Sequence, residues 1–256
     1  MPRPRYVPRP PLSDHIEFFW AFDTYGGSHA RERVLPTATS ELVVTLGDGR
    51  SHPVVCGAHA EFFMIDTGTP QSLLGVHFRP GGAVPFLKRP AHELVNTRVT
   101  LDALWGRAAS ELRERLHEAR TWEARFRVLE DVLCAQLAGS PPRHPAVTFA
   151  LDAIQAAPHA RTIGQLTERI GLSPRRFIEV FAAEVGLTPE LFCRVRRFQR
   201  VLALIERDEA IDWTEVALAC GYYDQAHFIH EFRAFSGINP TGYLRVRGPQ
   251  RNHIPL

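Results

Sequence analysis

GYYDQAHFIHEFRAFSGINPTGY, residues 221–243, decides how the C-terminal part of this chain folds. It opens with a glycine, and Asp224 is a residue type that caps helix N-termini. Phe228 and Phe232 follow at helical spacing. We expect a short helix before Gly221, a turn at that glycine and a second helix opened by Asp224. This arrangement is a helix-turn-helix motif.

The same pattern occurs once more, about 50 residues upstream. Ile163, Leu166, Thr167, Ile170 and Gly171 correspond to Trp213, Val216, Ala217, Cys220 and Gly221, and, after one inserted residue, Phe177, Ile178, Phe181, Gly186, Pro189 and Phe192 correspond to Phe228, Ile229, Phe232, Gly237, Pro240 and Tyr243. In the upstream copy, Ser173 is the N-cap and Pro174 stands at the first helical position. The repeat predicts two helix-turn-helix motifs in tandem, and two generic helical hairpins are the alternative.

The sequence gives more detail on two helices, the first helix of the upstream copy and the helix that connects the two copies. Thr162 and Gln165 have the spacing of a capping box that opens the first helix of the upstream copy. Residues 189 to about 207 form a connecting helix of roughly 28 Å, at about 1.5 Å per residue. Such a helix could hold the two second helices near the roughly 34 Å that separates successive major-groove segments on one face of DNA.

Polar side chains remain on the outer face of each second helix. They are Arg175, Arg176 and Glu179 in the first copy, and Gln225, Ala226, His227 and His230 in the second. Arginine pairs with guanine, glutamine with adenine and glutamate with cytosine, while alanine can touch the thymine methyl group. The sequence therefore predicts base reading at these helix N-termini. Taken singly, each residue could equally be a solvated surface side chain.

The net charge alone says little about a nucleic-acid partner. The chain has 256 residues, with 30 Lys+Arg against 28 Asp+Glu, and residues 145–256 hold 13 arginines against 12 acids. Positive charge must therefore be local, and we expect modest non-specific affinity. The clustered arginines are Arg175, Arg176, Arg194, Arg196, Arg197 and Arg200.

A proline-rich stretch at residues 138–145 predicts a domain boundary. Upstream, strands are expected within residues 15–88, from the alternation of Ile16, Phe18, Trp20 and Phe22 and from the apolar runs 41–46 and 73–78. Two helical stripes follow, at 101–116 and 122–137. We predict an α+β chain, with a β-rich domain at 1–140 that is closed by a helical hairpin and an all-α double helix-turn-helix domain at 145–256.

The C-terminal residues, from about 158 to 245, resemble the AraC/XylS family of transcriptional regulators, because residues 221–243 are close to that family's signature. The resemblance implies that both recognition helices bind adjacent major-groove segments of double-stranded DNA. Base contacts would come from Arg175, Arg176, Glu179, Gln225, Ala226 and His230, and Arg197 would contact phosphate. His227, beside the core residue Phe228, is interpreted as mostly structural. Pro174 and the two arginines after it depart from the family pattern and leave the base preference of the first helix open.

Residues 1–140 are similar to an uncharacterised type of domain found ahead of such motifs. The matching pieces are residues 35–48, 73–87, 90–96 and 101–106. By analogy this domain has a sensory or oligomerisation role. The expected partners are therefore a small-molecule effector, a second copy of the chain that pairs through the helical stripes, and RNA polymerase.

Other chemistry has weaker support in the N-terminal part. Histidines 52, 59 and 77 with Glu61 lack metal-ligand spacing, and no GxSxG elbow is present. Residues 79–82, Arg-Pro-Gly-Gly, could bind an anion but are better read as a turn. A ligand pocket lined by Trp20, Phe62, Phe63 and Met64 is an alternative to an aromatic core. We therefore predict no catalytic residues, no metal and no cofactor.

The four cysteines are widely spaced, no apolar run is long enough to span a bilayer, and residues 1–12 do not have the form of a signal peptide. We expect a cytoplasmic protein. Two other functions stay open from the residues alone. One is an enzyme or ligand-binding protein with an accessory DNA-binding domain, and the other is a protein-interaction module.

Overall fold

A six-stranded antiparallel sheet forms the body of the N-terminal part in a computed structural model of the protein, which describes residues 5–47, 52–156, 169–206 and 211–256. The strand order is β1-β2-β7-β4-β5-β8. The bounds are β1 Arg5–Tyr6, β2 Ile16–Tyr25, β4 Glu41–Leu46, β5 Val54–Cys56, β7 Gln71–Phe78 and β8 Arg98–Thr100. All-α elements follow in the C-terminal part, so the predicted α+β class is confirmed.

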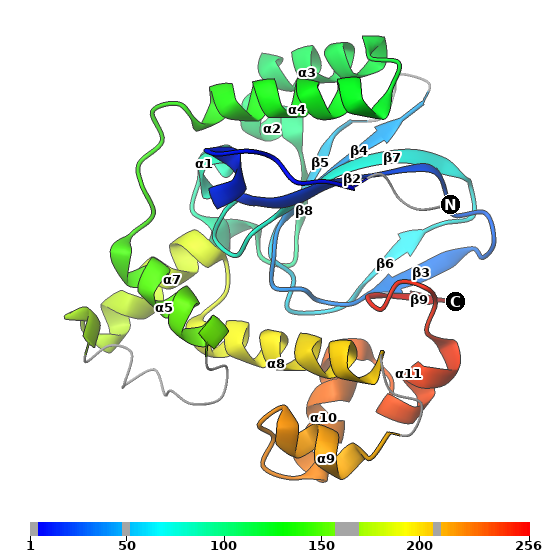
Figure 1. The fold of residues 1–256 in the computed structure, drawn as a ribbon, viewed down its shortest axis with the longest axis vertical. Coiled ribbons are helices and arrows are strands. Elements are labelled where there is room, and N and C mark those ends of the chain that lie inside the picture. Colours follow the sequence, from blue (N-terminus) through cyan, green and yellow to red (C-terminus); the bar gives the residue numbers. More distant parts are fainter. Residues whose placement is uncertain (1–4, 48–51, 157–168, 207–210) are drawn as a thin grey trace.

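Helices cover one face of this sheet (Figure 1). They are α2 Leu101–Trp105, α3 Arg107–Glu118 and α4 Trp122–Leu137, and three single turns accompany them, η1 Leu12–Asp14, α1 Val84–Leu87 and η2 Ala91–Leu94. Leu112 and Leu116 of α3 and Leu129 and Leu133 of α4 are buried in one cluster with side chains of the sheet. The predicted helical hairpin exists, and its apolar stripe completes the core of its own domain. Gly106, at φ +55°, divides the first predicted stripe into two helices.

The predicted alternation in β2 is interrupted, so its four residues do not all lie on one face of the sheet. Phe19 and Ala21 are fully buried against the helices, while Trp20 and Phe22 are half-buried on the other face. The pairing of β2 with β7 shifts register between Ile16 and Phe18. A one-residue irregularity moves the following side chains to the other face of a strand. Ile16 therefore lies on the core face and Phe18 on the opposite face, although the alternation predicted one face for both.

A second sheet of three strands lies below the first, in the order β6-β3-β9 (Figure 1). Its strands are β3 Arg31–Val34, β6 Phe63–Asp66 and β9 His253–Pro255. The edge strand β9 comes from the end of the chain, and it pairs with β3 through Val34↔His253 and Glu32↔Pro255. Residues 253–255 therefore fold with the N-terminal part, although the sequence-based boundary assigns them to 145–256. Residues 140–144 have no regular structure, as expected of a connection.

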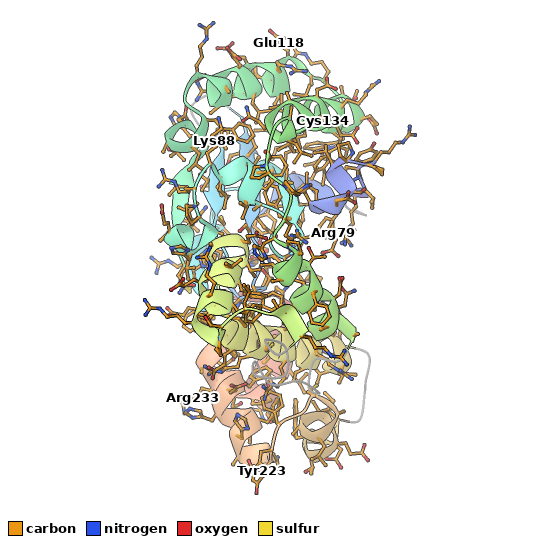
Figure 2. The ribbon with its side chains drawn as sticks, turned by 90° about the vertical axis from the view of Figure 1, so that its left-hand side faces the viewer. Arg79, Lys88, Glu118, Cys134, Tyr223 and Arg233 are labelled. Atoms are coloured by element: carbon orange, nitrogen blue, oxygen red, sulfur yellow. The ribbon has the colours of Figure 1, made fainter. Side chains whose placement is uncertain are left out.

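The C-terminal helices pack around one aromatic core. Their bounds are α5 Pro145–Ala156, α7 Pro174–Val185, α8 Pro189–Ile205, α9 Trp213–Ala219, α10 Gln225–Ser236 and α11 Pro240–Val246. The inner stripe predicted for the connecting helix α8 is buried as expected. The same cluster includes Leu35, Ala58 and Ala60 of the N-terminal part. One continuous core therefore joins both halves of an elongated molecule (Figure 2).

Some predicted features cannot be compared with the structure. Five residues of the predicted upstream motif lie outside the described residues, and so does Arg207. They are Thr162, Ile163, Gln165, Leu166 and Thr167. Among the helices that the structure describes, none has the length and apolar character needed to cross a membrane.

Candidate nucleic-acid interface

Both recognition helices begin at the residues that the repeat predicts. At α7, the Oγ of Ser173 accepts a hydrogen bond from the backbone N–H of Arg176 at 3.3 Å. At α10, the Oδ1 of Asp224 accepts one from the N–H of His227 at 2.7 Å. A cap of this kind satisfies a helix N–H that would otherwise lack a partner. The two copies therefore present their first turns in the same way.

The turn before each recognition helix depends on a glycine in the left-handed region. Gly171 has φ +70° and Gly221 has φ +77°, and they stand at equivalent positions of the repeat. Residues other than Gly, Asn and Asp rarely adopt this backbone conformation, because a side chain clashes with the backbone there. The glycine signal in the sequence therefore has a steric origin. After Gly221, Tyr222 is buried and its N–H donates to the carbonyl of Ala217.

Three charged side chains lie together on the first turns of α7. The Nε of Arg175 is 3.1 Å from Glu179 Oε1, and Nη1 of Arg176 is 3.5 Å from Glu179 Oε2. Hydrogen bonding from Arg175 is the main reason why the pKa of Glu179 is lowered. Arg175 is 91% exposed, so the group faces solvent with two guanidinium groups against one carboxylate. The structure brings together the three residues that the sequence singled out here.

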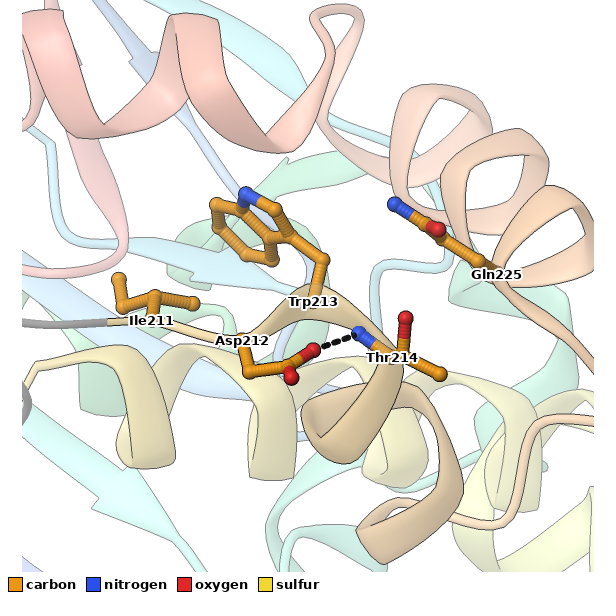
Figure 3. Close-up of a pocket in the computed structure, with 5 residues that line it drawn as sticks. All are labelled: Ile211, Asp212, Trp213, Thr214 and Gln225. Atoms are coloured by element: carbon orange, nitrogen blue, oxygen red, sulfur yellow. Dashed lines mark hydrogen bonds between the residues drawn. The ribbon is translucent and has the colours of Figure 1, made fainter.

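The first turns of α10 present amide, methyl and imidazole groups. Gln225, Ala226 and His230 are all exposed. The side chain of Gln225 stands beside the first turn of α9, where Asp212 Oδ1 accepts from the N–H of Thr214, and a shallow hollow separates them (Figure 3). His227 is less free, because its ring lies edge-on to Tyr222, with ring centroids 5.4 Å apart. The His227 side chain is nevertheless 41% exposed, and its mostly structural role stays a prediction.

Tyr223 is a surface residue that the sequence reasoning did not single out. It is 88% exposed and projects from the end of the molecule farthest from the N-terminal sheets (Figure 2). If the caps Ser173 and Asp224 are aligned, Tyr223 is the residue inserted in the second copy. An insertion placed immediately before a recognition helix, and filled by an aromatic residue, is the signal that could have identified it.

The arginines of α8 divide between two surroundings. Arg194 Nε is 2.6 Å from Oε1 of Glu231, whose side chain is only 6% exposed, and this pair ties α8 to α10. Arg197 donates to the carbonyl of Gly221 at 3.3 Å and stacks over Tyr222. Arg196 instead interacts electrostatically with Glu17 of β2. The predicted run of positive charge is therefore split, and Arg197 supports the turn of the second motif.

The far ends of both recognition helices dock on the N-terminal part. Gly186 ends α7, and a Cβ there would lie 3.0 Å from the Cβ of Ala58. Gly237, its equivalent in the repeat, ends α10, and a Cβ there would lie 2.9 Å from Arg33 Nη1 and from the ring of Phe62. The N-terminal part therefore contacts both motifs at equivalent positions of the repeat, Gly186 and Gly237. The capped N-terminal ends of α7 and α10 do not take part in these contacts.

Other residues considered in the sequence have local partners. His52 Nδ1 is 3.1 Å from Asp102, His77 Nδ1 is 2.7 Å from Glu41, and the ring of His59 packs on Phe63. Glu61 is exposed. Within the described ranges, no three His, Cys, Asp or Glu side chains are arranged to hold a metal ion. Residues 79–82 form a turn, in which the N–H of Gly82 donates to the carbonyl of Arg79.

In the comparison with known proteins, two family models match separate stretches of the chain, and each covers less than half of it. Residues 166–246 match a family described as a helix-turn-helix domain, and residues 4–100 match a domain of unknown function (DUF6597). An uncharacterised helix-turn-helix-type transcriptional regulator of Haemophilus influenzae is 30% identical over 83 residues, which are 32% of this chain and 28% of that protein. The chain thus matches less than a third of that relative.

Solved structures of regulators also match. A probable AraC family transcriptional regulator from Rhodopseudomonas palustris is 28% identical, over 40% of this chain and 96% of that one, with a TM-score of 0.36. The C-terminal domain of AraT, a response regulator from Geobacillus stearothermophilus, is 23% identical over 43% and 92%, with a TM-score of 0.39. ToxT from Vibrio cholerae is 10% identical over 89% and 97%, with a TM-score of 0.43.

Proposed function

We propose that this chain, whose C-terminal region belongs to the AraC-type helix-turn-helix family, is a transcriptional regulator that binds double-stranded DNA sequence-specifically through two recognition helices. The observation that carries the proposal is the pair of capped, exposed helix N-termini on α7 and α10. The C-terminal ends of both helices pack against the N-terminal part. The N-terminal end of a recognition helix is where base edges are read in the major groove.

The residues that we propose for base contact are those exposed at these two ends. They are Arg175, Arg176 and Glu179 on α7, and Gln225, Ala226 and His230 on α10. The first group offers donors to guanine and an acceptor to cytosine N4, and the second offers an amide to adenine and a methyl group to thymine. Arg197 is proposed for phosphate, although it also holds the turn at Gly221.

Selection from random duplexes, followed by footprinting, tests the proposal. Because the two motifs lie head to tail in one chain, the selected site should be asymmetric and about two helical turns long. A purified protein that binds duplexes with no sequence preference at any salt concentration would overturn it.

Changing Arg175 to alanine should weaken base discrimination at one segment of the selected site. The expected loss is about 1–3 kcal/mol, confined to one or two base positions, because a bidentate contact with a base edge is removed. Arg107→Ala is a matched control, since Arg107 is also 91% exposed and pairs with a glutamate four residues on, but lies on α3. Gel-shift titrations against single-base variants of the site measure both. Equal losses for the two variants would remove Arg175 from the interface.

Changing Arg197 to alanine should weaken binding to all sequences alike. Loss of one phosphate contact should also lower the slope of log affinity against log salt by about one. The measurement is a set of salt titrations on the selected duplex and on an unrelated duplex of equal length. A change at a single base position only would reassign Arg197 to base reading.

For residues 1–140 we propose effector sensing or dimerisation, which would modulate the DNA-binding part. A second copy of the chain and RNA polymerase are the protein partners that the AraC-type domain suggests. An enzyme with an accessory DNA-binding domain is the competing function. Metal analysis and thermal-shift screening separate the two, and they require the full chain because β9 completes a sheet of the N-terminal part. Stoichiometric bound metal would favour the enzyme.

A further inference from the structure

A cavity of about 910 Å³ lies in the N-terminal part, within the range of small-molecule sites. Its lining includes Trp20 and Phe22 of the six-stranded sheet and Phe63 of the three-stranded sheet. Residues 249–253, which lead into β9, also line it. From the sequence, a pocket was only the alternative to an aromatic core. Trp20 and Phe63 do line the cavity, whereas Met64 is exposed and Phe62 packs with the C-terminal core.

The strand register arranges this lining in rows across the sheet. Phe18, His77, Glu41, Cys56 and Arg98 are successive cross-strand partners and form a polar row, while Trp20, Gly75 and Val43 form the next row and Phe22, Leu73 and Thr45 the third. A Cβ at Gly75 would overlap the Trp20 indole, so the ring lies flat over that strand. The cavity is therefore polar along one row and largely apolar along the other two.

The free charge of the polar row is positive and lies at its β8 end. Glu41 is paired with His77, with Oε1 and Nδ1 2.7 Å apart. Arg98 has no carboxylate at ion-pair distance within the described part of the chain, and its guanidinium lies 6.0 Å from the centroid of Phe63. An anion placed beside Arg98 would find a guanidinium that forms no ion pair with an acid of the described protein.

Beside Arg98, His59 adds a buried polar residue to the lining of the cavity. The residue is 6% exposed, lines the cavity and packs on Phe63, with ring centroids 4.3 Å apart. Burial, followed by the charge of Arg98, lowers its pKa to about 4, so the imidazole is neutral near pH 7. Its Nε2 makes no hydrogen bond within the described protein. This nitrogen is fully buried, so a ligand oxygen reaches it only after the ring turns towards the cavity. The hydrogen bond would then remove a cost of about 1–3 kcal/mol.

We infer that the cavity binds an organic anion with a flat apolar body, its charged oxygen group between Arg98 and His59 and its body over Trp20 and Phe22. The guanidinium provides a charge-assisted hydrogen bond and the imidazole a neutral one. The aromatic rows exclude water from the remainder of the ligand. This inference rests on the proposed function, because it gives a chemical class to the effector of the regulator.

The wall of the cavity also touches the DNA-binding part. Leu35 lines the cavity and belongs to the core cluster of the C-terminal helices. The carbonyl of the next residue, Pro36, accepts a hydrogen bond from Gln199 Nε2 of α8 at 2.7 Å. His59 follows Ala58, which contacts Gly186 at the end of α7. A ligand that moves the first wall segment therefore acts on α8, and one that moves the second acts on α7.

Two fluorescent probes with the same aromatic body test the inference on the full chain. 8-Anilinonaphthalene-1-sulfonate carries an anionic group, and N-phenyl-1-naphthylamine lacks it. Arg98→Gln should weaken binding of the sulfonate about tenfold or more, as expected for a lost hydrogen bond to a charged group, and should change binding of the neutral probe less than about twofold. His59→Gln should act in the same direction. Arg115→Gln, on the surface of α3, is the control and should alter neither probe.

Equal weakening of both probes by Arg98→Gln, or no binding of the sulfonate to the unaltered protein, would overturn the inference. Gel shifts with the selected duplex are run on the same variants. Retained DNA binding with no probe selectivity would reject the anion site and leave the regulator proposal standing. Probe selectivity without any DNA binding would support the anion site and reject the regulator proposal.

Discussion

Replacing Glu32 by glutamine is expected to lower the free energy of unfolding at pH 7 by about 3 kcal/mol. Glu32 is almost fully buried on β3, where it accepts hydrogen bonds from Tyr25 and from His253 of β9, and its Oε1 is 2.5 Å from His29 Nε2. Burial raises its pKa, but hydrogen bonds from His253, Tyr25 and His29 outweigh this and lower the pKa from 4.5 to about 2. These bonds attach the C-terminal strand to the N-terminal part.

The pH dependence has a definite sign. Because the pKa of Glu32 is lower in the folded chain than in the unfolded one, its contribution is fully present above about pH 4.5 and is lost as the pH falls towards 2. Urea unfolding at several pH values measures this contribution. The Glu32→Gln variant should be less stable at neutral pH, and it should lose less of its stability in that acid window.

Glu17→Gln is the matched control for Glu32. Glu17 also faces a histidine, His77, at 3.6 Å, but its side chain is 47% exposed, so we expect a loss below about 1 kcal/mol. Hydrogen exchange adds a local readout, because the N–H of Leu256 donates to the carbonyl of Arg31. Faster exchange of Leu256 should accompany the loss of Glu32. An unchanged Leu256 amide would show that this cluster does not attach β9.

Replacing Gly237 by alanine is expected to cost about 2–5 kcal/mol and to weaken the attachment of the second motif to the N-terminal part. Gly237 has φ +74°, and a side chain in that conformation costs roughly 1–2 kcal/mol. The added Cβ would also press on Arg33 and Phe62, and overpacking costs about 1–3 kcal/mol. Displacing Arg33 would break its hydrogen bond to the carbonyl of Ser236, now 2.8 Å long.

Gly171→Ala separates the two causes. Gly171 has a similar φ of +70°, but a Cβ there would meet nothing within 4 Å, so only the backbone cost of about 1–2 kcal/mol applies. DNA binding provides the second measurement. With α10 released from Arg33 and Phe62, Gly237→Ala should discriminate less than the unaltered protein between the selected site and a site with one extra base pair between its segments. Equal stability losses for the two variants would show that Gly237 does not clamp α10.

The sequence alone determined the DNA-binding motifs, because they depend on short-range effects. Asp224 and Ser173 cap the helices that follow them, and Gly171 and Gly221 adopt turn conformations that few other residues tolerate. Each effect acts within one or two helical turns and leaves a fixed spacing in the chain. For the same reason, the first and last residues of β4 and the helical hairpin after residue 100 could also be predicted.

Only the tertiary structure decided which faces and which distant segments meet. A register shift in β2 moves Trp20 into a cavity and Phe19 into the core, although both are aromatic. The chain end at His253 pairs with β3, and Arg196 turns towards the N-terminal part. Such outcomes depend on packing between residues far apart in sequence, and a one-residue change in strand register reverses them. The repeat therefore specifies the two capped helices that we propose to read DNA, whereas the fold specifies what holds these helices.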